Sequence, residues 1–126
     1  MIPIYLFGLI SQNNSWLSAR QATVAGNIAN ANTPGFKAQD VTPFEAALDT
    51  ARLNMTQSNS RHLNVGDGTQ KPGEVQSQEG WEVTHSGNSV SLEQELIKSG
   101  EIGRAYRLNT SVVKTFHRMM LSAAKV

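Results

Sequence analysis

The chain has 126 residues, a formal net charge of +1, no cysteine and a hydrophobic content of 39%, below the share of about 45–50% usual for globular proteins. Without cysteine it has no disulfide, thiolate metal ligand or cysteine nucleophile, and its near-neutral charge without a Lys/Arg cluster argues against a nucleic-acid partner. We therefore expect one small domain with a thin core, in which partners supply part of the burial.

The first ten residues are the first distinctive element of the sequence. They are apolar, but a helix of this length is too short to cross a bilayer. No Lys or Arg precedes them, as a secretory signal peptide would require. We therefore expect no cleaved secretory signal.

A helix is predicted from Pro3 to about Asn30. Arg20 is the only charged side chain between Met1 and Phe36. Surface helices usually carry many charges, whereas neutral side chains suit a helix enclosed by neighbours, where an unpaired charge is costly. We interpret this helix as an interface shared between subunits. Its apolar residues fall on one stripe at helical spacing, comprising Ile10, Leu17, Val24 and Ile28.

The segment GNIANANTPGFK, residues 26–37, ends this helix. Asn30 or Asn32 is predicted to cap it in the left-handed conformation that asparagine tolerates. Pro34 fixes φ and Gly35 supplies a positive φ, so the chain turns sharply before Phe36. Two interpretations of Phe36 remain open: an aromatic peg whose direction the turn sets, or an ordinary buried side chain after a helix stop.

A second, shorter helix is predicted after this turn. Thr42 would be its N-cap, Pro43 its first residue and Glu45 the capping-box partner. The helix would continue through Ala46, Ala47 and Leu48 to Leu53. Its apolar content is modest.

Residues 54–89 are rich in Ser, Gln, Asn, Gly and Thr, with isolated apolar residues between turn signals. We expect a β-hairpin at most in this region. Its short strands would lie at Leu63 to Val65 or at Glu74 to Val83.

The last helix is predicted to start at a capping box, Ser91 to Gln94, and to run to the C-terminus. Gly100 and Gly103 lower its helix propensity and indicate either a kink or a close backbone contact. We expect one stripe of this helix to pack on the first helix and another on a different subunit. The first stripe comprises Leu92, Leu96, Ser99, Gly103, Tyr106, Thr110, Val113, Met120 and Ala124. The second comprises Ile102, Ala105, Val112, Phe116, Met119 and Ala123.

The sequence contains none of the familiar motifs of an active site or metal site. His62, His85 and His117 are the only histidines, and none belongs to an H-x-x-x-H or H-E-x-x-H pattern that would place two ligands on one helical face. We expect no catalytic residue, no metal and no cofactor. Trp16 and the Met119–Met120 pair are interpreted as packing residues. A small hydrolase using His62 or His85 is a remote alternative.

Three segments resemble the axial proteins of the bacterial flagellum, whose rod and hook members share an N-terminal signature ending in N-x-A-N-x-x-T-P-G-F. Here the signature reads NIANANTPGF at residues 27–36. Residues 39–48, QDVTPFEAAL, resemble its continuation in the basal-body rod proteins, and residues 103–109, GRAYRLN, resemble their R-A-Y-x-x-N element. The short chain also agrees with a rod member, because hook and distal-rod relatives carry extra outer domains.

The resemblance implies a mainly α fold in which long N- and C-terminal helices pair as an antiparallel coiled coil, with a short β-hairpin or loop-rich middle segment. Both termini would form one structural domain. We expect an N-terminal helix and turn at residues 1–36 and a short helical connector at residues 37–53. A polar loop or hairpin region would follow at residues 54–89, and the C-terminal helix at residues 90–126.

The resemblance further implies a structural, non-enzymatic subunit of the proximal rod. It would be exported by the flagellar type III apparatus and polymerise in the periplasm into a hollow axial drive shaft. The implied partners are other rod subunits, in homo- and hetero-oligomeric assembly, and the inner-membrane ring and export gate, contacted by Ile2 to Ile10. No nucleic acid and no small-molecule substrate is expected. A secretion adaptor or chaperone of a type III export system is the alternative, because it would also pair amphipathic helices without an active site.

We expect the subunit interface in the family motifs and on the helix stripes. The amides of the turn would satisfy backbone groups at subunit junctions, and the turn would aim Phe36 at a neighbour. Until neighbours cover these surfaces, the isolated subunit is expected to be largely unfolded or loosely helical. The predicted interface residues are Asn27, Asn30, Asn32, Thr33, Pro34, Gly35, Phe36, Phe44, Tyr106, Asn109, Val113, Phe116 and Met120.

Overall fold

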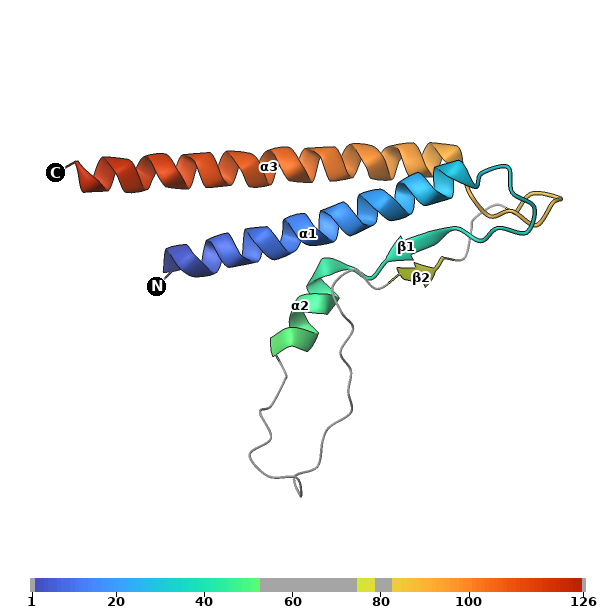
Figure 1. The fold of residues 1–126 in the computed structure, drawn as a ribbon, viewed down its shortest axis with the longest axis horizontal. Helices are drawn as coiled ribbons and strands as arrows, with labels where there is room; N and C mark the ends of the chain where they lie inside the picture. The colour runs from blue at the N-terminus through green and yellow to red at the C-terminus, as the bar shows by residue number, and fades with distance from the viewer. Residues whose placement is uncertain (1, 53–74, 79–82, 126) are drawn as a thin grey trace, which may run out of the picture.

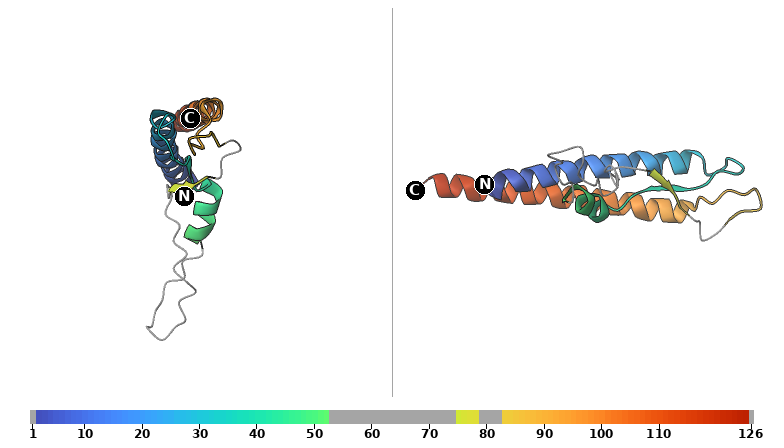
Figure 2. Two further views of the ribbon diagram at one scale, coloured as in Figure 1. Left: turned by 90° about the vertical axis from the view of Figure 1, so that its right-hand side faces the viewer. Right: turned by 90° about the horizontal axis from the view of Figure 1, so that it is seen from below.

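A computed structural model of the chain describes residues 2–52, 75–78 and 83–125, and two long helices lie side by side in it (Figure 1). Helix α1 covers Ile2–Ala29 and helix α3 covers Leu92–Ala124. The two helices run antiparallel, and the last turns of α3 extend beyond the start of α1 (Figure 2). The predicted pairing of the terminal helices in a mainly α fold is confirmed.

The core between the helices is one line of side chains. Leu17 and Val24 of α1 pack against Ile102 of α3, and each is at most 2% exposed. Ile28, which the sequence placed on the same stripe as Leu17 and Val24, is 38% exposed. It follows Val24 by one turn, past the last α1 residue of this core, so the stripe is buried only in part.

The face of α3 toward α1 takes side chains from both predicted stripes, so the division between them was wrong. Ile102 and Ala105 of the second stripe lie there together with Tyr106 of the first. Leu92 and Leu96, also assigned to the first stripe, are exposed. The line of contact runs between the stripes because α1 covers only one narrow arc of its partner.

Helix α3 is continuous through both of its glycines. A Cβ added at Gly100 would have no neighbouring heavy atom within 4 Å, and one added at Gly103 would meet only the end of the Arg107 side chain at 3.8 Å. Within the subunit, therefore, neither glycine breaks the helix or serves a close backbone contact. The predicted capping box is wrong, because the Ser91 side chain makes no capping hydrogen bond and its Oγ donates to the Glu93 carboxylate at 3.3 Å.

Two short strands form a small antiparallel sheet under α1 (Figure 1). Strand β1, Gln39–Val41, pairs with β2, Val75–Ser77, with Val41 opposite Val75. The expected strand within residues 74–83 is confirmed at β2. Its partner, β1, lies in the predicted helical connector and not within residues 54–89. The alternative strand at residues 63–65 lies outside the described residues.

Helix α2, Phe44–Arg52, follows β1 and begins one residue later than predicted. Pro43 precedes the helix, and its carbonyl accepts the hydrogen bond of the Ala47 N–H at 3.2 Å. Ala47 is buried. The predicted final residue, Leu53, lies outside the described residues.

The end of α1 differs from the predicted asparagine cap. Among the described residues only Gly35, at φ 73°, and Gly87, at φ 80°, have a positive φ. The left-handed cap at Asn30 or Asn32 was therefore wrong, whereas the positive φ at Gly35 is confirmed. Asn30 instead closes the helix through its side chain, whose Nδ2 donates to the Gly26 carbonyl at 2.8 Å. No described helix combines the length and apolar character needed to cross a membrane.

Candidate assembly interface

Asn88 joins the end of α1 to the segment that leads into α3. Its side-chain Nδ2 donates to the carbonyls of Asn30 at 2.8 Å, Ala31 at 3.0 Å and Thr33 at 2.8 Å. Its Oδ1 accepts from the Val90 N–H at 2.8 Å. One buried amide thus binds three carbonyls of the turn that follows α1, two of which also accept from backbone N–H groups of the same turn.

The sequence analysis did not single out Asn88 as a structural centre. The signal available was a Gly-Asn pair, typical of turns, just before the predicted start of the last helix. That signal predicts a turn, but it does not reveal that carbonyls more than fifty positions away will need a donor.

The two connecting segments meet beside Asn88. The Gly35 N–H donates to the Ser86 carbonyl at 2.9 Å, and the Ser89 N–H donates to the Phe36 carbonyl at 3.0 Å. The Ser89 hydroxyl also accepts from the Ala38 N–H at 2.8 Å. The Thr-Pro-Gly-Phe turn is therefore held by the chain that enters α3.

Asn27, the first asparagine of the signature, lies inside the subunit and is 1% exposed. Its Nδ2 donates to the Gln39 carbonyl at 2.7 Å and to Glu95 Oε2 at 3.1 Å, and its Oδ1 accepts from the Gln39 N–H at 3.0 Å. The amide groups of Asn27 therefore bond within the subunit.

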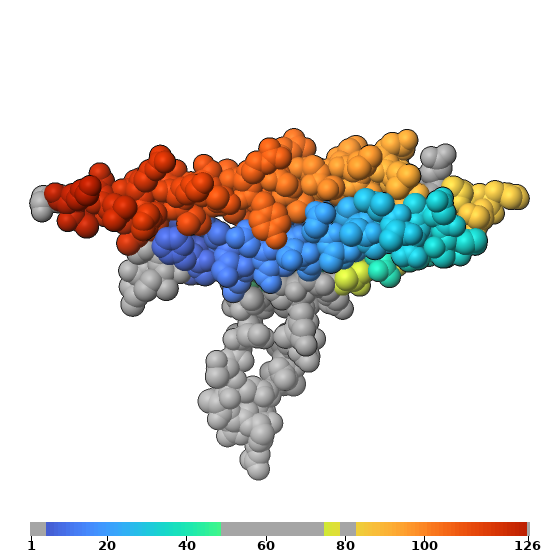
Figure 3. Space-filling view, turned by 45° about the horizontal axis from the view of Figure 1, so that its top comes forward, coloured from blue at the N-terminus to red at the C-terminus, as the bar shows by residue number. Residues whose placement is uncertain are grey.

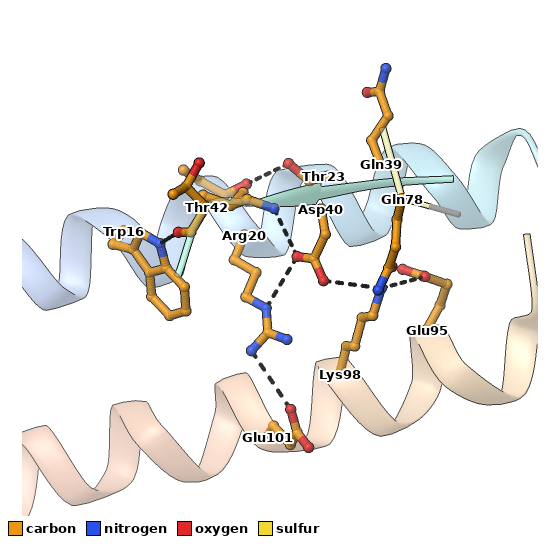
Figure 4. Close-up of polar contacts among 12 residues, drawn as sticks. Trp16, Arg20, Thr23, Gln39, Asp40, Thr42, Gln78, Glu95, Lys98 and Glu101 are labelled. Carbon is orange, nitrogen blue, oxygen red and sulfur yellow. Dashed lines mark hydrogen bonds and ion pairs between the residues drawn. The ribbon is translucent and has the colours of Figure 1, made fainter. Parts of the chain in front are cut away.

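A chain of charged side chains links α1, β1 and α3 (Figure 4), and its member Glu95 accepts the hydrogen bond from Asn27. Arg20 lies 3.4 Å from Asp40 and 3.6 Å from Glu101, while Lys98 lies 3.2 Å from Asp40 and 3.1 Å from Glu95. Glu95 is almost fully buried and Lys98 is 12% exposed at its side chain. The only charged residue of α1 thus has partners on both neighbouring elements, which offsets the cost of partly burying it.

Trp16 connects α1 to the residues at the start of α2. Its indole Nε1 donates to the Thr42 carbonyl at 2.7 Å, and its ring lies 5.9 Å from that of Phe44. The Arg20 guanidinium lies 5.5 Å from the centre of the indole ring, within cation–π range. The packing role predicted for Trp16 is confirmed.

A second set of contacts holds the helices together toward the chain termini. Tyr106 donates its hydroxyl to the Asn14 carbonyl at 3.0 Å. The Asn109 Nδ2 donates to the side-chain oxygens of Asn13 at 2.8 Å and Asn14 at 2.7 Å. Nearer the end of the pair, Phe7 and Phe116 stack edge to face with ring centres 5.6 Å apart.

The predicted interface residues divide into two groups. The first is buried or half-buried in the subunit and comprises Asn27, Asn30, Phe36, Phe44, Tyr106, Asn109, Val113 and Phe116. The second is exposed and comprises Asn32, Thr33, Pro34, Gly35 and Met120. Met120 follows Ile102 by eighteen residues, or five helical turns, so it lies on the α1-facing side in the last turns of α3. The role of both groups as contacts between subunits stays a prediction.

Large apolar side chains remain exposed on both helices. Tyr5 is 62% exposed, Leu96 65% and Leu108 64%. Further exposed apolar residues on α3 are Ile97, Val112, Met119 and Leu121. Small uncharged residues form an exposed face of α1, comprising Gly8, Ser11, Ser15, Ser18, Ala22, Ala25 and Ala29. Figure 3 shows one side of the pair formed by α1 and α3.

The geometry gives no sign of a metal centre. Among the described residues, no group of three or more His, Asp or Glu side chains lies close enough to hold a metal ion. His85 and His117 are exposed, and His62 lies outside the described residues.

Comparison with known proteins points to one family. The family model of the flagella basal body rod protein matches residues 14–37, which include the signature and turn. Similar proteins include the flagellar basal body rod protein FlgB of Agrobacterium fabrum, 47% identical over 99% of this chain and 96% of that protein. The FlgB proteins of Aeromonas hydrophila and Borreliella burgdorferi are 33% and 31% identical over 71% and 76% of this chain, covering 69% and 78% of their own lengths. The chain therefore belongs to the flagellar basal-body rod protein family.

Proposed function

We propose that the chain is a structural subunit of the proximal rod, which polymerises through α1 and α3 into a hollow axial drive shaft in the periplasm. Family membership supports a structural role in the basal body. The proposed mode of assembly rests on the incomplete burial of the helix pair. A core of Leu17, Val24 and Ile102 covers one line of each helix, while apolar side chains on other faces stay exposed.

An exposed apolar surface of this extent favours a role in association, because large apolar patches usually mark sites of contact with other molecules. The outer face of α1 supports the same conclusion. Its small, uncharged side chains allow another helix to approach closely without burying an unpaired charge. The contacts would be with other rod subunits, both copies of this chain and related chains.

The partners at the base of the rod would be the inner-membrane ring and the export gate. Residues 2–10 begin α1, and the exposed rings of Tyr5 and Phe7 lie on its first turns. The exposed Met119 and Met120 lie on the last turns of α3, which adjoin the start of α1 (Figure 2). An apolar end on an elongated subunit suits a terminal contact with another protein.

Gene deletion with fractionation of basal bodies tests the proposed function. Deletion should abolish swimming and flagellar filaments, and a tagged copy should restore both and sediment with detergent-insoluble basal bodies. An adaptor or chaperone would instead be recovered as a discrete soluble oligomer. Intact filaments in the deletion strain, or a tagged chain found only in the soluble fraction, would refute a rod subunit.

Substitution of the turn tests whether it contacts neighbours. Asn30→Ala together with Phe36→Ala should abolish motility while the subunit is still secreted. His85→Ala is the matched control, since this exposed residue lies outside the signature and should leave swimming unchanged. Normal swimming of the double variant would exclude the proposed role of the turn.

A further inference from the structure

Helix α3 carries an exposed line of side chains that α1 does not cover. It runs through Leu108, Val112, Thr115 and Met119, which are separated by four, three and four residues. Leu108 is 64% exposed, Val112 37% and Met119 56%, and Thr115 is exposed as well. This spacing is typical of a helix that packs lengthwise on one partner helix. We call these four residues the outer seam.

The outer seam lies on a different side of α3 from the core. At about 100° per residue, its four residues fall within an arc of about 60°, centred about 110° from the direction of Ile102. Asn109 and Phe116 lie between the seam and the core side, and both contact α1. The seam therefore offers a second packing surface on α3, next to the one that α1 occupies.

Basic side chains line the edge of the outer seam that is farther from α1. Arg104, Arg118 and Lys125 are spaced by multiples of seven residues, and all three are exposed. They occupy a heptad position that flanks a coiled-coil seam, where charged residues select the partner helix. Two more exposed bases lie beside them, Arg107 and Lys114. We call these five residues the basic flank.

The charge of the basic flank is not balanced by the part of the chain that the structure describes. Residues 102–126 contain no acidic residue. Glu101, the last acidic residue, lies one turn before Arg104 and pairs with Arg20 at 3.6 Å. The positive charge is therefore strongest toward Arg118 and Lys125. A helix that covers the outer seam has to bring acidic side chains to this edge, because basic ones would be repelled.

The described helices of this chain do not offer such an acidic face. Helix α1 has one charged residue, Arg20. Helix α2 has nine residues and is about 13 Å long, whereas the basic flank extends over about 30 Å. Near the start of α3, Glu95 is buried and pairs with Lys98, and Glu101 pairs with Arg20. Glu93 is thus the one acidic residue of α3 without a described basic partner.

The charges also disfavour two copies of α3 packed seam against seam. In an antiparallel pair the two basic flanks would face each other and repel. In a parallel pair each flank would face Asn109, Phe116 and Ala123, which carry no charge, so its bases would stay without ion pairs. A copy of this chain therefore does not complement the seam.

We propose that the outer seam and the basic flank bind an acidic helix of a different protein, which packs as a third helix beside α1 and α3. This inference rests on the proposed function and deepens it, because it names the class of partner for one face of the subunit and assigns copies of the chain to other faces. Apolar residues of the partner would pack on Leu108, Val112 and Met119. Its acidic residues, seven positions apart, would pair with Arg118 and Lys125.

A single helix fits the outer seam better than a bilayer does. A helix that lies in a membrane surface buries a broad apolar face, whereas a narrow stripe at heptad spacing is the mark of a coiled-coil contact. The seam is such a stripe and includes the polar Thr115. The apolar side of α3 around Ile102 is already covered by α1.

Photo-cross-linking in assembled basal bodies tests the contact. Benzoylphenylalanine in place of Leu108 or of Met119, both exposed, should cross-link the chain to a different protein. Mass spectrometry should place the linked peptide in a helix with acidic residues seven positions apart. A linked peptide from a second copy, or from a partner segment without acidic residues, would overturn the proposal. Basal bodies that contain the variants without any protein cross-link would also overturn it, while leaving the proposed rod function intact.

Thr110 provides the matched control position. It is exposed on the same part of α3, but it lies about 170° around the helix from the outer seam. Benzoylphenylalanine in place of Thr110 should give no cross-link to the protein that the seam captures. The same product from Thr110 would show that the contact does not depend on the seam.

Charge exchange gives an independent test. Arg118→Glu together with Lys125→Glu should lower the yield of the Leu108 cross-link about tenfold, because two attractive pairs become repulsive. Lysine in place of the partner's two facing acidic residues should restore the yield. The pair Thr110→Glu and His117→Glu adds charge on the opposite side of α3 and should leave the yield unchanged.

Three results of the charge exchange would count against an acidic helix. An unchanged yield, or no restoration, would contradict the pairing with the basic flank. If the seam gives no protein cross-link and the full chain floats with phosphatidylglycerol vesicles but not with phosphatidylcholine vesicles, the basic flank belongs to a membrane contact instead.

Discussion

Asn27 pairs with the backbone of Gln39 as a neighbouring strand would, accepting from its N–H at 3.0 Å and donating to its carbonyl at 2.7 Å. The same Nδ2 donates to Glu95 Oε2 at 3.1 Å. One buried amide therefore connects α1, β1 and α3, because it carries a donor and an acceptor on two separate atoms of one short side chain.

Asn27→Asp should strongly destabilise the subunit. The substitution replaces the donor with a buried carboxylate oxygen that faces the Gln39 carbonyl and the Glu95 carboxylate, a loss of about 3–5 kcal/mol. Asn27→Ala should cost about 1–3 kcal/mol, because it leaves the Gln39 backbone without its partner. Urea unfolding followed by circular dichroism, with trimethylamine N-oxide added to stabilise the folded state, measures both. The exposed Asn32→Ala should change stability by less than about 0.5 kcal/mol, and equal effects of all three variants would refute this account.

Asn88→Asp should loosen the junction between α1 and α3. Aspartate is close in size and keeps an acceptor for the Val90 N–H, but it cannot donate to the carbonyls of Asn30, Ala31 and Thr33. We expect faster proteolytic cleavage within residues 30–36, measured by mass spectrometry of limited digests. His85→Ala serves as the control in the same connecting segment. Unchanged cleavage would show that the three hydrogen bonds are dispensable.

The substitution Gly→Ala should lower the stability of the subunit at a glycine with positive φ and raise it at a glycine within a helix. Gly35 has φ 73°, and Gly35→Ala should destabilise the subunit by about 1–2 kcal/mol. Gly26 and Gly100 lie on helices with no neighbouring heavy atom within 4 Å of an added Cβ, so alanine at either should stabilise by about 0.5–1 kcal/mol. Thermal unfolding in the presence of trimethylamine N-oxide, which stabilises the folded state, compares the three variants. A stabilised Gly100→Ala subunit that no longer enters basal bodies would place a close contact with a neighbour at this glycine.

The isolated subunit should have little cooperative tertiary structure. Its helix pair buries a core of three side chains, with Trp16, Ala105 and Tyr106 packed against it, and long helices in water depend on such packing for most of their stability. Far-UV circular dichroism of dilute monomer should show a broad, weak thermal transition, while helix content should rise with protein concentration. A sharp melt at micromolar concentration, independent of concentration, would contradict this expectation.

The two terminal helices could be predicted from the sequence because each is long enough for its pattern to repeat several times. Leu17 and Val24 show the effect, since they are seven residues apart and both are buried. Ile28 has the right spacing but lies beyond the core. Periodicity identifies a face of a helix, but it does not show how far along the helix a partner extends.

The small sheet could not be predicted in the same way. Each strand has three residues, too few for an alternating pattern to stand out, and β1 pairs with a strand more than thirty positions later. The hydrogen bonds of Asn27 and Asn88 could likewise not be predicted from the sequence, because folding brings their backbone partners near from distant positions in the chain. The motif identified Asn27 but not Asn88, and the structure shows that the amide of Asn27 bonds within its own subunit.

The pairing of Val41 with Val75 means that the chain leaves the helix pair and returns to it at one place. A segment whose two ends are held together can lengthen at small entropic cost, because the entropy of loop closure grows only slowly with the length of the loop. New folded modules could therefore be grafted between these two valines while α1 and α3 keep their geometry. Diversification of such filaments could have proceeded by growth at this single point, with the inner scaffold left unaltered.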